Sequence, residues 1–178
     1  MLTEVDFSVV LNFWFSEGVK PNWFIKDFEF DKLITQKFEN IYLMAKIEKL
    51  DQWTQTPEGC LALIIALDQF PRNMFRDLPQ SFETDSKALS LTKYALDNKM
   101  DKNLNSEQKQ FLYMPLMHSE NLKGQELLLT LFLSENTYAR RHWEIIKTFN
   151  RFPHRNKILG RESTKEDLEF LQTPNSSF

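Results

Sequence analysis

Hydrophobic residues recur every three or four positions along nearly the whole chain, and charged residues fill the positions between them. The clearest run predicts one face of a helix of about five turns. Its apolar positions are Phe30, Ile34, Phe38, Ile41 and Ala45. No segment alternates at every second residue, and clusters of β-branched residues are scarce. The pattern therefore predicts an all-α fold of stacked antiparallel helical hairpins.

Capping signals divide this pattern into separate helices. Asp31 is expected to cap the helix over residues 30–45, because a carboxylate accepts from the free amides of a first turn. Thr56 followed by Pro57 is expected to open a second helix that runs to residue 69. Further helices are predicted at residues 6–15, 82–98, 106–114, 121–134, 137–149 and 165–172.

Length, charge and cysteine content narrow the class of protein. The 178 residues predict one helical domain over residues 1–172, with a frayed tail over residues 173–178. The formal charge of −3 gives no electrostatic reason to expect nucleic acid or a membrane surface as a partner. Cys60 is the one cysteine, which suits a reducing compartment. With no secretory signal pattern and no apolar run of ~20 residues, we expect a soluble cytoplasmic protein.

One short motif occurs twice, each time after an apolar helix. Residues 70–73 read Phe-Pro-Arg-Asn, and residues 152–156 read Phe-Pro-His-Arg-Asn. We call residues 70–76 the first arm and residues 151–161 the second arm. Because proline disfavours helical backbone at the residue before it, each motif is expected to end its helix and to present its polar residues from a stiff turn.

Asp68 continues the apolar stripe of the helix that precedes the first arm. A carboxylate that faces a core, at the negative end of its own helix, is unfavourable for two reasons. We therefore expect Asp68 to form a buried ion pair with an arginine, which would join the two arms if that arginine comes from the second. The alternative is that the arginines only cap carbonyl groups at the ends of their helices.

Three motifs, in order, resemble a bacterial family known as domain of unknown function 924. They are Leu-Asp-Gln-Phe-Pro-Arg-Asn at 67–73, Tyr-Met-Pro-Leu-Met-His-Ser-Glu at 113–120, and Arg-Phe-Pro-His-Arg-Asn at 151–156 followed by Leu-Gly-Arg-Glu-Ser-Thr. The resemblance implies an all-helical, tetratricopeptide-like fold and no established activity. Asn150 and Lys165 stand where the family often has Gly and Pro, and Asn is expected to keep a left-handed turn. No regular repeat of ~34 residues is present.

Imidazole, carboxylate and guanidinium groups make up the candidate site. His118, Glu120 and His154 are the candidates for acid–base catalysis, because imidazole titrates near neutral pH and a carboxylate can orient it. His142 lies on an apolar stripe and is expected to be a core histidine. Guanidinium forks suit carboxylate or phosphate recognition. The residues expected to bind such a ligand are Arg72, Asn73, Arg76, Arg151, Arg155, Asn156 and Arg161.

These candidates leave several functions open. The first is a pocket between the two arms that binds or transforms a small anionic metabolite, and the polar content of the arms favours it. The second is a non-enzymatic helical protein-interaction module in which the polar network is structural. The minority alternative is a metal-dependent hydrolase with His118, His154 and Glu120 as ligands, although no metal-binding helical spacing is present. No cofactor is expected, and the sequence leaves catalysis and oligomeric state open.

Overall fold

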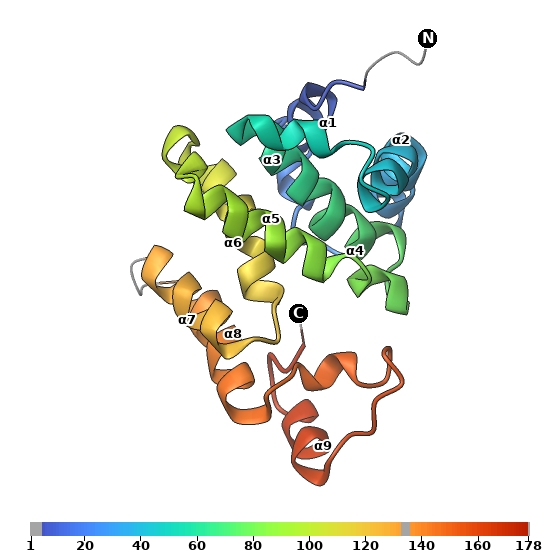
Figure 1. Cartoon of the computed structure of the whole chain (residues 1–178). Coiled ribbons are helices and arrows are strands. Elements are labelled where there is room, and N and C mark those ends of the chain that lie inside the picture. The colour runs from blue at the N-terminus through green and yellow to red at the C-terminus, as the bar shows by residue number, and fades with distance from the viewer. Residues whose placement is uncertain (1–4, 133–135, 178) are drawn as a thin grey trace. The chain divides into compact units, whose positions relative to one another are not determined.

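The computed structural model describes residues 5–132 and 136–177 and is all-α over those ranges, with no strand (Figure 1). No helix within them is both long enough and apolar enough to cross a membrane. The α-helices are α1 (Ser8–Trp14), α2 (Phe28–Lys46), α3 (Pro57–Ile64), α4 (Phe70–Met74), α5 (Asp85–Asp97), α6 (Ser106–His118), α7 (Leu122–Leu131), α8 (Thr137–Phe149) and α9 (Lys165–Leu171).

Contacts group the chain into two compact units. Unit 1 contains the described residues up to Arg76 together with Gln80–Pro115, and unit 2 contains Asp77–Pro79 and the described residues from Leu116 onward. Unit 1 therefore holds the first arm, and unit 2 holds the second arm. The grouping concerns contacts alone, so the prediction of one folding domain over residues 1–172 stays a prediction.

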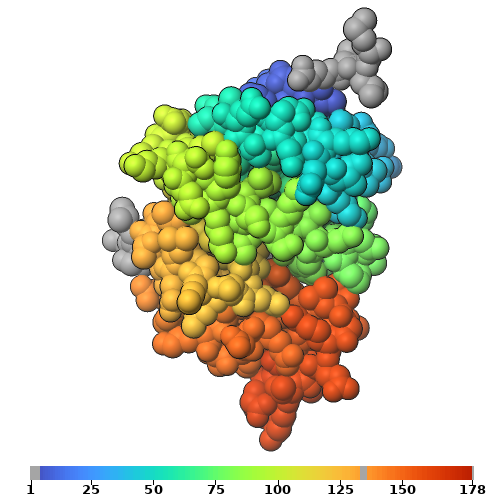
Figure 2. Space-filling view, in the orientation of Figure 1, coloured from blue at the N-terminus to red at the C-terminus, as the bar shows by residue number. Residues whose placement is uncertain are grey.

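Helix α3 forms the centre of unit 1. Its residues from Gly59 to Ile64 are all buried, and it packs against α1, α5 and the short 3₁₀ helix η2 (Asp51–Gln55). A helix that is apolar on every side belongs in a core, which agrees with this position. Aromatic rings extend the core, with the ring of Phe38 stacked 4.6 Å from that of Phe70. Figure 2 shows that side chains fill the spaces between the ribbons of this unit, coloured blue to yellow-green.

The cap of α2 is Asp27, so the prediction that Asp31 caps this helix is wrong. The Asp27 backbone is extended, and its Oδ1 accepts from the amides of Glu29 (2.8 Å) and Phe30 (3.0 Å). The helix thus begins at Phe28, two residues earlier than the core-facing positions suggest. Asp31 lies inside the first turn, is buried, and binds side chains of the first arm.

The first Phe-Pro motif does not end its helix, contrary to the prediction. Phe70 is helical (φ −59°, ψ −44°), and a π-helical turn, η3 (Ile65–Gln69), passes directly into α4. Because Pro71 has no amide hydrogen, the carbonyl of Leu67 lacks its usual helical donor. Thr84 Oγ1 donates to this carbonyl instead, at 2.5 Å. A hydroxyl from outside the helix thus allows the chain to remain helical through the proline.

The second motif in unit 2 does end its helix, as predicted. Helix α8 stops at Phe149, and Asn150 adopts the expected left-handed conformation (φ 58°). Phe152 is extended, and Pro153–Arg155 form the 3₁₀ helix η6. The buried ring of Phe152 joins a core with Ile145 and Ile146 of α8. The same sequence motif therefore has two backbone conformations in the two arms.

The end of the predicted helix 106–114 shifts as well. Helix α6 continues through Pro115 to His118, four residues past its predicted end, and His118 is therefore its last residue. At the C-terminus, Ser176 is buried and its hydroxyl donates to the carbonyl of Leu171 at 3.2 Å. A capping box between Thr164 and Asp167 opens α9.

Candidate functional site

Asp68, just before the first arm, is fully buried in the π-helical turn η3. Its Oδ2 accepts from Gln69 Nε2 at 2.6 Å, and its Oδ1 lies 3.3 Å from Nη1 of Arg72, one turn later. Arg72 also binds Asp85 with both terminal nitrogens, at 2.9 and 3.0 Å. Burial alone would lower the pKa of Arg72, but the two carboxylates outweigh it and the pKa is raised. Arg72 is thus charged and bound to protein carboxylates.

Asp31 of α2 is the second carboxylate that binds the first arm. Arg76 donates to it through Nε (2.6 Å) and Nη2 (2.7 Å), and Asn73 donates through Nδ2 (2.8 Å). This geometry is the bidentate fork that a guanidinium forms with a carboxylate ligand. This role of Asp31 was not predicted from the sequence. The available signal was its position on the buried stripe of α2, next to Phe30, which is the same signal that identified Asp68.

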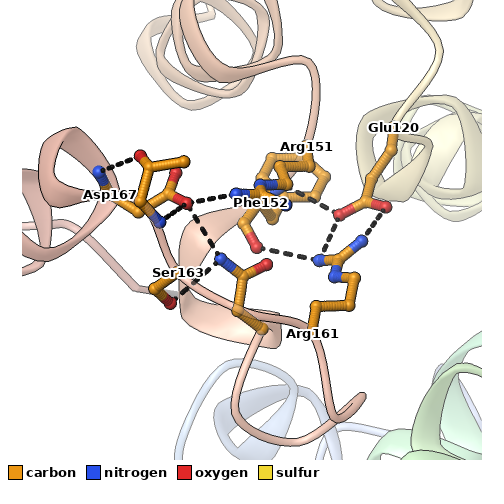
Figure 3. A network of polar contacts seen from close by, with 8 residues as sticks. Glu120, Arg151, Phe152, Arg161, Ser163 and Asp167 are labelled. Carbon is orange, nitrogen blue, oxygen red and sulfur yellow. Dashed lines mark hydrogen bonds and ion pairs between the residues drawn. The ribbon is translucent and has the colours of Figure 1, made fainter.

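Glu120, in the loop after α6, binds the guanidinium of Arg161 in the second arm (Figure 3). Arg161 donates from Nη1 to Oε2 (2.8 Å) and from Nη2 to Oε1 (3.0 Å). The amide of Phe152 donates to the same Oε1 at 2.7 Å, and its carbonyl accepts from Arg161 Nη2. Burial would raise the pKa of Glu120, but the hydrogen bonds from Arg161 and Phe152 lower it overall. Glu120 is therefore an ionised carboxylate that holds the second arm to the loop after α6.

Asp167 is the other centre of the second arm, and Figure 3 shows three groups directed at it. Its Oδ2 accepts from the amide of Thr164 (2.9 Å), from Asn156 Nδ2 (3.2 Å) and from Arg151 Nη2. Burial would raise the pKa of Asp167, but these donors lower it overall. Asp167 was not among the predicted site residues, because no local pattern links it to Arg151.

The three histidines of the sequence all lie in unit 2 and interact electrostatically with one another. His142 is buried, as predicted, and burial lowers its pKa to about 3. Burial also lowers the pKa of His154 to about 4, and the adjacent Arg155 adds to that effect. Both imidazoles are thus neutral at pH 7 and do not attract an anion by charge. Arg155 is buried, with its guanidinium 4.6 Å from the centre of the Phe152 ring.

Metal binding and thiol chemistry have no assembled site in the described part of the chain. No three His, Cys, Asp or Glu side chains come together there as a metal ion would need, so His118, Glu120 and His154 do not form such a group. Cys60 is fully buried, and burial raises its pKa to about 11, which keeps it a thiol at neutral pH. The expectation that the two arms lie close together is not tested by these contacts and stays a prediction.

A groove in unit 1 lies outside both arms and was not predicted. Its volume is about 450 Å³, and its walls come from Glu48 after the end of α2, from η2 and from one face of α5. No motif in the sequence marks it. The lining residues are Glu48, Thr54, Lys87, Ser90, Leu91 and Tyr94.

Comparison with known proteins places the chain in a family. The sequence profile described as "Bacterial protein of unknown function (DUF924)" matches residues 10–175. The solved structure of a protein of unknown function from Agrobacterium tumefaciens is similar, with 33% sequence identity and a TM-score of 0.88. The match covers 93% of this chain and 96% of that one. No curated protein matches. The chain therefore belongs to the bacterial family of unknown function DUF924, as the three motifs led us to expect.

Proposed function

We propose that the chain is a non-enzymatic helical protein-interaction module whose two arms are structural. The observation that carries this proposal is the occupation of the arms by carboxylates. Six of the seven side chains expected to bind an anion donate to Asp31, Asp85, Glu120 or Asp167 of their own unit. A free anion would have to displace a tethered carboxylate from each fork. The residues concerned are Arg72, Asn73, Arg76, Arg151, Asn156 and Arg161.

An apolar corner of unit 1 supports the binding role. We define the corner as Phe24, Ile25 and Phe28, which lie within five residues at the start of α2 and are 57% to 73% exposed. The ring of Phe24 stacks parallel to the buried ring of Phe111, at 6.2 Å, which fixes its position. Apolar side chains grouped on a surface typically mark interaction sites, and burying each would contribute ~1.5–3 kcal/mol. The expected partner is a segment of another protein that presents apolar side chains to this corner.

Selection from a phage-displayed library of random 12-residue peptides, with the full chain immobilised, tests this proposal. We expect a family of enriched peptides whose binding is lost when Ile25→Ser and Phe28→Ser are combined. Tyr138→Ser is the matched control, because Tyr138 is an equally exposed aromatic residue on α8 in unit 2. Failure to enrich peptides, or binding that survives the corner variant, would overturn the proposal. Concentration-dependent dimerisation that the corner variant abolishes would also overturn it, in favour of a second copy as the partner.

Binding or conversion of a small anionic metabolite is the second candidate, and one observation favours it. His118, His154 and Arg155 gather beside Glu120 in unit 2 and interact electrostatically, and such clusters occur at sites of acid–base chemistry. This candidate predicts saturable heat in a calorimetric titration with citrate or phosphate. Arg155→Lys should keep the charge but abolish that heat, because only the guanidinium forms a bidentate fork. Titrations without saturable heat would eliminate this candidate and leave the interaction module.

A further inference from the structure

We infer that the groove of unit 1 binds a cationic side chain, arginine or lysine, of the partner segment. This inference rests on the proposed function and adds the chemistry of the partner. The groove is about 450 Å³ in volume, within the ~300–1,000 Å³ of small-ligand sites. Four of its lining residues recur at helical spacing on one face of α5, so the wall is a regular helical surface. They are Lys87, Ser90, Leu91 and Tyr94.

The charge of the groove favours a cation. Lys87 is bound at the negative end of α2, where its Nζ donates to the carbonyl of Ala45 at 2.8 Å. The carboxylates of Glu48 and Asp51 lie 3.5 and 3.9 Å from the same nitrogen. Glu48 and Lys87, the charged residues of the lining, balance each other, and the carboxylate of Asp51 beside the groove and the C-terminus of α2 add negative charge. Both carboxylates are more than half exposed, so their remaining lone pairs are accessible to a ligand.

The hydroxyl groups near the groove are acceptors as well. Ser90 Oγ donates its hydrogen to the carbonyl of Ser86 (2.9 Å), and Thr54 Oγ1 donates to the carbonyl of Asp51 (2.7 Å). Each oxygen then has only lone pairs left for a ligand. A guanidinium or an ammonium offers several donors and no acceptor, and therefore matches this lining. An anionic ligand would instead meet like charge from Glu48 and Asp51.

Tyr94 and Leu91 supply the apolar part of the groove. Tyr94 is 43% exposed although it lines the groove, so a flat cation can stack on its ring. Guanidinium groups stack on aromatic faces more readily than ammonium groups, which favours arginine over lysine. The methylene stem of such a side chain would pack on Leu91. The groove thus offers an apolar surface for the methylene stem and hydrogen-bond acceptors for the charged group.

Titration of the ¹⁵N-labelled full chain with N-acetyl-L-arginine amide, followed by NMR, tests this inference. We expect saturable shifts at the amides of Glu48, Leu91 and Tyr94. Binding should weaken about two- to fivefold in Tyr94→Leu, and by a similar factor in Glu48→Gln. Glu166→Gln, which removes an exposed carboxylate from α9 in unit 2, is the matched control and should leave binding unchanged.

The outcomes separate this inference from the proposed function. Absence of saturable shifts at the groove, or equal binding of the neutral N-acetyl-L-glutamine amide, would overturn the inference. If phage-selected peptides still depend on Ile25 and Phe28 in that case, the interaction module stands without a cation site. If the arginine probe binds but no peptide is enriched, the groove is a cation site and the proposed function fails.

Discussion

Replacing Asp31 by alanine tests whether the first arm is held by its carboxylate. The substitution removes three charge-assisted hydrogen bonds, two from Arg76 and one from Asn73. Loss of one partner from a buried pair destabilises a protein by ~3–5 kcal/mol. The Arg76 side chain is 26% exposed, so water recovers part of its solvation. We therefore expect a loss of about 2–3 kcal/mol in the free energy of unfolding.

Urea denaturation followed by circular dichroism measures this loss. With an m-value of about 2 kcal/mol/M, the midpoint should fall by about 1–1.5 M. Asp31→Asn keeps the shape and one acceptor oxygen, and should lose about half as much. Glu29→Ala is the matched control, because Glu29 is an exposed acid on the same helical turn, and its effect should stay within about 0.5 kcal/mol. An Asp31→Ala midpoint within about 0.25 M of wild type would refute the structural role of the first arm.

Three further predictions follow from buried groups. Thr84→Val should lower the free energy of unfolding by about 1–3 kcal/mol, because the buried Leu67 carbonyl loses its donor; an unchanged urea midpoint would contradict this. Burial lowers the pKa of His142 to about 3 and that of His154 to about 4, from 6.5 in the unfolded chain. The stabilisation of the fold by these neutral imidazoles is therefore complete above pH 6.5 and is lost as the pH falls toward the two lowered pKa values. Urea midpoints should therefore decrease from pH 7 to pH 5, above the range where carboxylates titrate, and equal midpoints would show that these imidazoles are not buried. Cys60 should react with Ellman's reagent at pH 8 only after unfolding, and stoichiometric labelling of the folded chain within minutes would contradict its burial.

Apolar periodicity predicted most of the helices, because most of them bury one apolar stripe in the core of their unit. Helix α8 has the predicted bounds of residues 137–149. The wrong predictions concern places where one side chain fits two structural roles. Asp31 suits a cap and also suits a buried pair, and periodicity alone does not choose between them. The helix through Pro71 depends on the hydroxyl of Thr84, 17 residues after the Leu67 carbonyl to which it donates, and local rules for proline do not include such a contact.

The candidate site was less predictable, because its pairs connect distant segments. Asp68 and Arg72 are one helical turn apart, so a pair between them follows from spacing alone. Arg76 and Asp31 are 45 residues apart, and Arg161 and Glu120 are 41 apart, so no spacing rule links them. As long as those carboxylate partners are unknown, the arginines resemble an empty anion-binding site. No sequence pattern predicted the groove beside α5, because its residues are ordinary for an exposed helix face.

The melting temperature in a phosphate titration at constant ionic strength tests the central claim most directly, because it asks whether the arm arginines are already occupied. The account predicts a change of less than about 1 °C, since the forks of Arg72, Arg76 and Arg161 are filled by tethered carboxylates. A saturable rise of about 5 °C or more, as expected for a ligand at ~100-fold its Kd, would contradict it. Loss of that rise in Arg161→Gln would locate the anion in the second arm.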